Sequence, residues 1–207
     1  MIQSDSLLFS YPRGPEFNFP AFALEKGESL LVLGASGSGK STWLQLLSGL
    51  REPQQGEVKI GNNALFSMSQ NLRDRFRARH IGFVFQDHSF IPSLNAWENI
   101  QLPFSQGLAF PKERAQELSE QLGLAALLKK RPQQLSQGER QRLSVLRAVL
   151  PQPDLILADE PSSSLDDTNC EKLIHLLKTQ CSLAGSSLIV VTHDQRIKDQ
   201  FERRIER

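Results

Sequence analysis

A glycine-rich segment that directly follows an apolar run is the feature that most constrains how this chain folds. Residues 28–34 read ESLLVLG, a continuous apolar run typical of a strand buried on both faces. GASGSGKST follows at residues 34–42, satisfies the pattern G-x-x-x-x-G-K-[ST], and leads into apolar residues at helical spacing. A strand, a glycine loop and a helix in this order predict a loop whose backbone N–H groups bind phosphate.

The residue types in this loop have separate physical tasks. Glycines allow backbone turns that a Cβ would block, so that successive N–H groups converge on phosphate. Lys40 supplies positive charge to the β and γ phosphates, and the Ser41 hydroxyl can bind Mg²⁺. The alternative is a flexible Gly/Ser turn, which the flanking strand and helix disfavour. The predicted nucleotide-binding residues are Gly34, Ala35, Ser36, Gly37, Ser38, Gly39, Lys40, Ser41 and Thr42.

Two adjacent carboxylates end a second apolar run, LILADE at residues 155–160. The carboxyl ends of parallel strands form the edge where open α/β sheets bind ligands. Because adjacent strand residues point to opposite faces, Asp159 and Glu160 are predicted to differ in role. We expect Asp159 to polarise Mg²⁺ or its water and Glu160 to hold the attacking water as general base. The alternative is two solvated acids at a strand end.

Two further polar residues end apolar runs at the same predicted edge. His193 ends SSLIVVTH at residues 186–193, and Gln86 ends IGFVFQ at residues 81–86. A histidine in this place can reach a γ-phosphate, and a side-chain amide can bind the metal or the attacking water. An ordinary surface position is an equally good interpretation of each residue taken alone.

A second cluster of serine and glycine, LSQGERQR, stands at residues 135–142, far from the first. Ser136 can cap the N–H of Glu139 while Glu139 reaches back, which is the reciprocal capping box. The exposed N–H groups of such a helix start can bind an anion. Taken alone, the segment is better interpreted as an ordinary capped surface helix.

Alternating strands and helices predict an α/β fold with a mainly parallel sheet covered on both faces. Residues 5–24, with apolar clusters broken by prolines, predict short antiparallel strands at the N-terminal end. Residues 87–135 lack a strand signal and predict a helical subdomain inserted into a sheet-containing core of residues 1–86 and 136–207, within one domain of residues 1–207. Other strands are predicted at 57–61, 81–86, 154–159 and 186–193, and helices at 95–101, 111–122, 136–150, 167–183 and 194–202.

Composition argues against several other classes of protein. Lys and Arg total 24 against 23 Asp and Glu, so a net charge of +1 gives no overall attraction to nucleic acid or anionic lipid. RDRFRAR at residues 73–79 is better interpreted as a solvated face than as a nucleic-acid patch. Cys170 and Cys181 lack a CxxC partner and predict buried, reduced thiols. The longest apolar runs fall short of the roughly 20 residues that span a bilayer, and the start lacks a leader pattern, so we expect a cytosolic chain.

Taken together, these segments resemble the ATP-binding-cassette (ABC) ATPases over essentially the whole chain. They have the order and spacing of that family: the phosphate loop at 34–42, Gln86, LSQGE at 135–139, LILADEP at 155–161, SSLD at 163–166 and VVTHD at 190–194. The resemblance implies a P-loop NTPase fold that binds ATP and Mg²⁺ and hydrolyses ATP. It departs from the family at Gln137, where the commonest signature has glycine, and in the residues between Pro161 and Asp166.

The resemblance also implies roles for individual residues. In the family the signature segment, here LSQGE at residues 135–139, faces the γ-phosphate bound to a second cassette. Ser136 and Gly138 would therefore act in trans. The implied partner is a second copy of this chain or another ABC ATPase. The implied roles are adenine stacking by Tyr11, phosphate and Mg²⁺ binding by Lys40 and Ser41, metal sensing and transmission by Gln86, general base catalysis by Glu160, coupling of the two sites by Asp166, and γ-phosphate binding by His193.

Residues 81–104 are similar to the group that includes lipoprotein-releasing and macrolide-exporting ATPases. That similarity implies an integral membrane permease subunit as partner, a place on the cytoplasmic face of the inner or plasma membrane, and a role in export or lipoprotein release. Residues 87–105 would then form much of a groove for a helix of that subunit, although packing within the helical subdomain explains the same apolar side chains equally well: Phe90, Ile91, Leu94 and Trp97. The alternatives are a soluble ABC ATPase that acts on nucleic acid or ribosomes, and a small-molecule P-loop kinase.

Overall fold

A parallel sheet of five strands forms the centre of the molecule, in the order β11-β5-β10-β9-β8. The computed structural model describes residues 1–163 and 165–207, apart from the side chain of Gln106, so Ser164 of the SSLD segment lies outside the described residues. The strands of the sheet are β5 (Ser29–Leu33), β8 (Ile81–Val84), β9 (Leu155–Asp159), β10 (Ser187–Thr192) and β11 (Arg203–Glu206).

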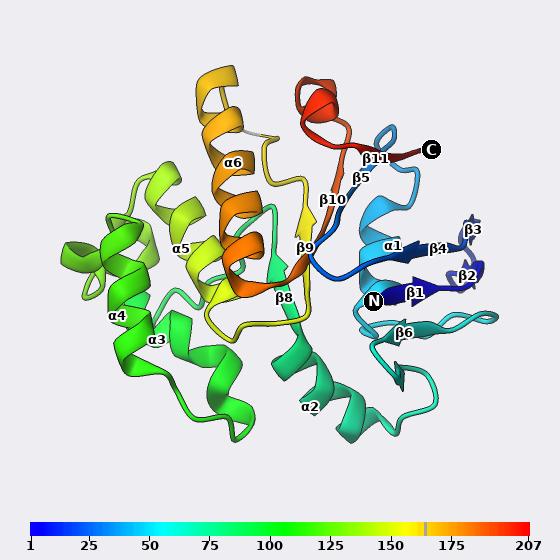
Figure 1. Ribbon diagram of the computed structural model, residues 1–207, viewed down its shortest axis with the longest axis horizontal. Helices are drawn as coiled ribbons and strands as arrows, with labels where there is room; N and C mark the ends of the chain where they lie inside the picture. The colour runs from blue at the N-terminus through cyan, green and yellow to red at the C-terminus, as the bar shows by residue number, and fades with distance from the viewer. Residues whose placement is uncertain (164) are drawn as a thin grey trace.

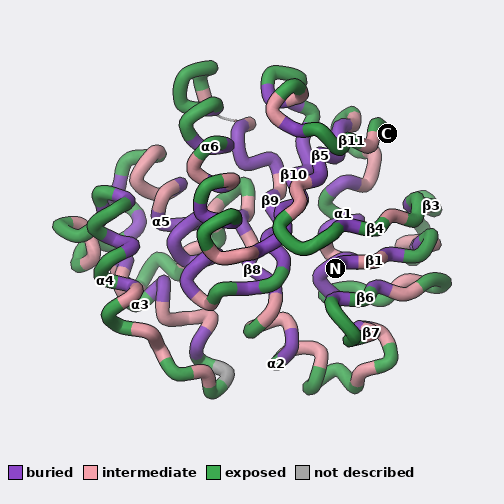
Figure 2. The backbone as a smooth tube through the Cα atoms, viewed as in Figure 1, coloured by how far each residue is buried: buried purple, intermediate pink, exposed green. Residues whose placement is uncertain are grey.

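Helices cover both faces of this sheet, as the continuous apolar runs predicted. Helix α1 (Lys40–Leu47) packs on one face, and α5 (Gln137–Val149) and α6 (Asp167–Ala184) pack on the other (Figure 1). Alternate residues of β5 divide between the two cores: Leu30 and Val32 join the α1 side, whereas Leu31 and Leu33 join the α5 and α6 side. Nearly all residues of β5, β9 and β10 are accordingly buried (Figure 2).

Antiparallel strands lie beside the α1 side of the sheet, and they confirm the prediction for the N-terminal stretch. One sheet has the order β4-β1-β6-β7 and a separate ribbon pairs β2 with β3. The strand predicted at 57–61 is present as β6, which belongs to this antiparallel sheet: it pairs with β1 and alternates buried, exposed and buried residues, so it is not buried on both faces. The bounds are β1 (Ile2–Ser4), β2 (Leu7–Ser10), β3 (Glu16–Phe19), β4 (Phe22–Leu24), β6 (Val58–Ile60) and β7 (Asn63–Ala64).

Short helices follow β8 and gather beside α5, at the end of the molecule opposite the antiparallel strands (Figure 1). Aromatic side chains hold this part together: Phe104 and Trp97 both meet Phe110 edge to face. The elements are α3 (Ala96–Gln101), η1 (Leu102–Gln106), α4 (Lys112–Gln121), η2 (Ala125–Leu127) and η3 (Pro132–Gln134).

Two elements differ from the predictions. Helix α2 (Gln70–His80) was not predicted as a helix, because Phe76 is its one buried residue and the segment therefore lacks an apolar stripe. The helix predicted at 194–202 is a shorter 3-10 helix, η4 (Gln195–Gln200), followed by the unpredicted edge strand β11. Within the described residues, the helices are all too short or too polar to cross a membrane.

Candidate active site

The phosphate loop connects β5 to α1 and needs its glycines for specific reasons. Gly37 and Gly39 have φ of 81° and 87°, the left-handed region that side chains rarely adopt. A Cβ on Gly39 would also lie 2.6 Å from the Phe17 ring, and one on Gly34 would lie 2.7 Å from the Ser38 hydroxyl. The Ser38 hydroxyl is buried and has no hydrogen-bond partner among the described residues, so it can serve a polar ligand.

Lys40 is folded back over its own loop. Its side chain is only 6% exposed, and its Nζ donates to the carbonyls of Gly34 at 2.8 Å and Ala35 at 3.0 Å. The same Nζ lies 3.3 Å from the Glu160 carboxylate. A buried ammonium therefore stands between the first turn of α1 and the carboxylate, where it can neutralise phosphate charge.

Asp159 and Glu160 contact different groups, as their adjacent positions predicted. Asp159 ends β9 and accepts a hydrogen bond from the Ser41 hydroxyl at 3.1 Å. Glu160 follows with φ of 45° and accepts from the Thr192 hydroxyl at 2.7 Å. Its carboxylate also lies 3.0 Å from Nδ1 of His193. The left-handed turn at Glu160 therefore directs this carboxylate toward the end of β10.

The same contacts set the protonation of the two carboxylates. Burial raises the pKa of Asp159, and the hydrogen bond from Ser41 only partly offsets this effect. Burial also raises the pKa of Glu160, but hydrogen bonds from His193 and Thr192 and the charge of Lys40 outweigh it, so the pKa is lowered overall. Glu160 is thus ionised at neutral pH, the state in which a carboxylate can accept a proton.

Tyr11 lies in the loop that follows β2 and approaches the start of α1. Its hydroxyl is 2.9 Å from the Thr42 hydroxyl, and its ring packs edge to face against Phe9. The guanidinium of Arg51 lies 4.8 Å from the centre of the Tyr11 ring, a contact that the sequence did not predict. The structure thus brings Tyr11 to the phosphate loop and leaves its ring half-buried.

Gln86 is exposed and lies in a turn just beyond β8, which ends at Val84 and is shorter than predicted. Val84 pairs with Ala158 in the parallel ladder, so Gln86 and Glu160 each lie the same number of residues beyond a paired position. His193 directly follows β10, with 58% of its side chain exposed. The three residues therefore leave the sheet at one edge.

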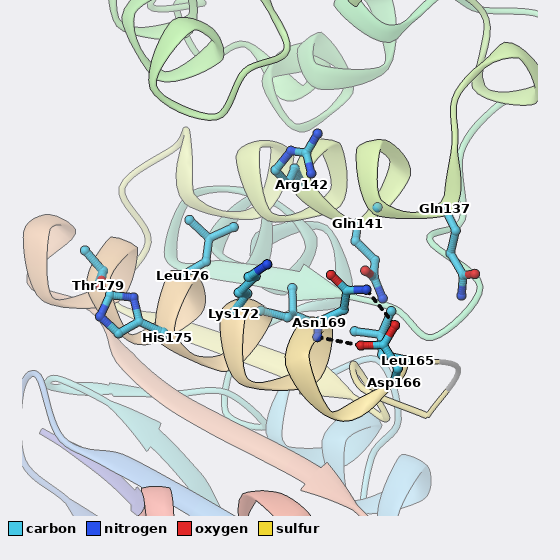
Figure 3. A pocket seen from close by; sticks show the side chains of 12 residues that line it. Gln137, Gln141, Arg142, Leu165, Asp166, Asn169, Lys172, His175, Leu176 and Thr179 are labelled. Carbon is cyan, nitrogen blue, oxygen red and sulfur yellow. Dashed lines mark hydrogen bonds between the residues drawn. The ribbon is translucent and has the colours of Figure 1, made fainter.

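The second serine and glycine cluster forms the predicted capping box at the start of α5. The Glu139 N–H donates to the Ser136 hydroxyl at 3.3 Å, and the Ser136 N–H donates to the Glu139 carboxylate at 2.7 Å. Gly138 lines a groove of about 580 Å³ between α5 and α6, and Asp166 lies across it as the cap of α6 (Figure 3). Gln137 stands at the same end of the groove, beside Asp166 (Figure 3).

The profile of the ABC transporter family matches residues 18–163. The chain belongs to this family.

Individual relatives extend over most of the cassette. The lipoprotein-releasing system ATP-binding protein LolD of Colwellia psychrerythraea (strain 34H) is 39% identical over 186 residues, which cover 88% of this chain and 72% of that protein. The uncharacterized ABC transporter ATP-binding protein YbbA of Escherichia coli (strain K12) is 41% identical over 183 residues, which cover 87% and 80%. A dimeric post-hydrolysis structure of the cassette MJ0796, bound to ADP and Pi, has a TM-score of 0.87 at 34% identity and covers 100% of this chain and 94% of that one.

These similarities confirm the predicted family and fold class. The cassette is an ATP-binding, ATP-hydrolysing subunit of the ABC transporter type. The relatives do not favour the alternative of a soluble ATPase acting on nucleic acid or ribosomes.

A polar network around the buried Asp194 connects the end of β10 to the start of α6, and the sequence did not predict it. Asp194 accepts from the Ser162 hydroxyl at 2.8 Å and from Arg196 through Nε at 2.9 Å and Nη2 at 2.7 Å. Arg196 also donates to the Leu165 carbonyl at 3.1 Å and to Asp167 at 2.6 Å. Polar residues after a buried strand were the available signal, but the partners are distant in sequence.

This network predicts a pH-dependent loss of stability. Hydrogen bonds from Arg196 hold the pKa of Asp194 well below its usual range. A carboxylate with a lowered folded pKa stabilises the protein above its unfolded pKa of about 3.9, and that contribution is lost as pH falls toward the folded pKa. We expect Asp194→Asn to lower the free energy of unfolding by about 1–3 kcal/mol at neutral pH.

Urea denaturation across the acid range measures this effect. The free energies of unfolding of the wild type and Asp194→Asn should converge as the pH falls below about 4, because protonation of Asp194 removes the same charge as the substitution. Asp199→Asn is the matched control, since the Asp199 side chain is 98% exposed and its ion pair with Arg204 is long, at 3.5 Å. A difference between wild type and Asp194→Asn that stays constant with pH would contradict the assignment.

Proposed function

We propose that this cassette closes with a second copy of itself, or with another ABC ATPase, around two ATP molecules and thereby drives a separate integral membrane subunit. The observation that carries the ATPase part is the convergence of Lys40, Thr192 and His193 on the Glu160 carboxylate beside the phosphate loop. In the proposed arrangement residues 1–86 and 136–207 form the ATP-binding core of the single domain, and residues 87–135 form its helical subdomain.

The chain's own residues supply the proposed hydrolysis. Lys40 and the N–H groups of the phosphate loop bind and neutralise the β and γ phosphates. Glu160, which is ionised, orients a water molecule and accepts its proton as the water attacks the γ-phosphate. His193, whose Nδ1 lies 3.0 Å from Glu160, binds the γ-phosphate with its side chain. Inorganic phosphate and ADP are the products.

The residues around Ser41 fit a magnesium ion. The Ser41 hydroxyl and the Asp159 carboxylate are already hydrogen-bonded to each other at 3.1 Å, and the Gln86 amide follows the next strand of the sheet. All three present oxygen, the donor that Mg²⁺ prefers, and Mg²⁺ takes few protein ligands when phosphate supplies others. When bound, the ion neutralises charge on the β and γ phosphates.

The remaining predicted site residues bind adenine, bind the partner's nucleotide or couple the two sites in this proposal. Tyr11 stacks on adenine with the ring face that Arg51 leaves free. Ser136 and Gly138 bind the γ-phosphate held by the partner cassette, as the resemblance to ABC ATPases implies, and their helix start can bind such an anion. Asp166 couples the two sites from across the groove between α5 and α6. The dimer of MJ0796 bound to ADP and Pi supports this arrangement.

The helix of the membrane subunit is proposed to bind in a cleft between β8, η1 and α2. Of the side chains predicted for this role, Trp97 packs against Phe110 and Phe90 lies under Arg147, whereas Ile91 is 42% exposed. The cleft itself consists of two adjoining cavities of about 210 and 330 Å³, which share Ile81, Leu102 and Pro103. Phe83 and Phe85, stacked 4.2 Å apart, add apolar area to the first cavity.

Relatives support the kind of partner. LolD is named for a lipoprotein-releasing system, and YbbA for an ABC transporter. We infer that this cassette serves export or lipoprotein release from the cytoplasmic face of the inner or plasma membrane.

Co-purification tests the membrane partner. A tagged Glu160→Gln cassette, extracted from its own cells in mild detergent with Mg-ATP, is expected to retain a multi-spanning protein in fixed stoichiometry. Adding Phe85→Glu replaces an aromatic ring of the cleft with a charge and should reduce the recovered partner at least about tenfold, because apolar contact area is lost and a carboxylate must leave water when the partner binds. Arg79→Glu on the exposed side of α2 is the control for charge alone. Recovery of only soluble proteins or nucleic acid, with ATP binding intact, would contradict the proposal.

A further inference from the structure

The turn that carries Gln86 has an unusual backbone. This turn connects β8 to α3, and His88 and Ser89 have φ of 57° and 44° in succession. Residues other than glycine seldom adopt the left-handed backbone region. Two such residues in succession persist only where the surrounding structure holds them. The structure therefore has to contain groups that fix this turn.

Arg147, in the last turn of α5, holds the first half of the turn. Its side chain is buried and donates to the carbonyls of Ser89, at 2.9 Å, and of His88. The guanidinium also lies 4.7 Å from the centre of the Phe90 ring. Burial lowers the pKa of Arg147 to about 10, which still leaves the side chain protonated at neutral pH. The buried guanidinium of Arg147 thus donates to two consecutive residues of one turn.

Asn99 holds the second half of the turn from α3. This side chain is fully buried and accepts from the Ile91 N–H at 2.9 Å. It also donates to the carbonyls of Leu94 at 3.1 Å and Asn95 at 3.0 Å. The turn is therefore fixed at its far end to the helix that follows it and at its near end to α5.

Helix α5 extends this connection to the signature segment. Ser136 caps the first turn of α5 and Arg147 lies in the last, roughly 16 Å away at 1.5 Å per residue. A packed helix moves as a rigid element, so a displacement at Arg147 also moves the N-terminus of α5. The turn that carries Gln86 and the signature segment thus lie at the two ends of one continuous set of contacts.

We propose that Arg147 is a positioning residue that couples Gln86 to the signature helix, so that nucleotide-dependent displacement of one moves the other. The inference rests on the proposed function. Arginine suits the task because its planar fork donates to two carbonyls while its face covers the Phe90 ring. Lysine would keep the charge but contact fewer of these groups, which makes Arg147→Lys the informative conservative change.

A double-mutant cycle with Gln86→Ala tests the coupling. We expect Arg147→Lys and Gln86→Ala each to lower kcat about tenfold, with KM for ATP changed less than about twofold, since both act on one step. The double variant should be close to the single variants and not about a hundredfold slower, because residues that act as a unit are not additive. Arg142→Lys is the control, as Arg142 lies on the same helix but donates to the Leu122 carbonyl instead.

A multiplicative loss in the double variant, or normal kcat in Arg147→Lys, would overturn the inference. Hydrogen exchange on wild-type protein, kept monomeric by dilution, provides a second measurement that does not depend on a variant's folding. ATP should change the protection of amides in residues 86–95 and 137–141 together, and a change confined to the first range would overturn the coupling. Absence of ATP hydrolysis in the wild type would instead contradict the proposed function.

Discussion

Glu160→Gln is expected to lower the rate of ATP hydrolysis by about 10²–10⁴-fold, the usual contribution of a positioned general base. Glutamine matches the shape of glutamate and can still accept from the Thr192 hydroxyl, which lies 2.7 Å away. It cannot take a proton from water, so the attack of water on the γ-phosphate is slowed. ATP affinity should be retained, because the phosphate loop is unchanged.

The variant should also accumulate as an ATP-dependent dimer, because ATP that is not hydrolysed keeps the two cassettes closed. Phosphate release measures the first effect, and light scattering with and without Mg-ATP measures the second. Glu28→Gln is the matched control, since Glu28 is a half-exposed carboxylate that pairs with Arg203 at 2.7 Å, away from the phosphate loop. A Glu160→Gln protein that hydrolyses ATP at the wild-type rate, or stays monomeric at high ATP and protein concentrations, would contradict the proposal.

The sequence predicted the parts of the fold in which burial and periodicity agree. β5, β9 and β10 are buried on both faces and therefore appear as continuous apolar runs. The sheet to which β6 belongs was not predictable, because a short apolar segment does not show which strand it pairs with. β11 was missed because it has one apolar residue and is held at the edge by backbone pairing with β5.

The candidate site was predictable where residues follow a strand and obscure where contacts join distant segments. Asp159, Glu160 and His193 were predicted because strand ends of a parallel sheet meet at one edge, and Lys40 was predicted from the phosphate-loop motif. Nothing in the sequence indicated that Glu160 adopts φ of 45°, which brings its carboxylate to the Thr192 hydroxyl. The hydrogen bonds from Arg147 to the turn that carries Gln86 were equally unpredictable. In the sequence, a buried arginine of a helix cannot be told apart from one on the exposed face.

Lys40→Ala is expected to weaken ATP binding by about 10- to 150-fold, which corresponds to the roughly 1.5–3 kcal/mol of a charge-assisted hydrogen bond. The Lys40 Nζ stands 2.8 Å from the Gly34 carbonyl and 3.3 Å from Glu160. Its removal takes away the buried positive charge that attracts phosphate and leaves the negative charge of Glu160 uncompensated beside the phosphate loop. Repulsion is thereby added to the lost attraction.

The same substitution separates binding from folding. The Gly34 and Ala35 carbonyls lose a donor, so a modest loss of stability is expected even without nucleotide. Titration of a fluorescent ATP analogue, together with thermal unfolding of the nucleotide-free protein, distinguishes the two effects. Lys59→Ala, at the exposed position of β6, controls for loss of a lysine. ATP affinity equal to that of the wild type would remove the phosphate loop from the proposed site. Weak binding in a stably folded variant would instead locate the loss at the phosphates, because the remaining loop and Tyr11 are intact.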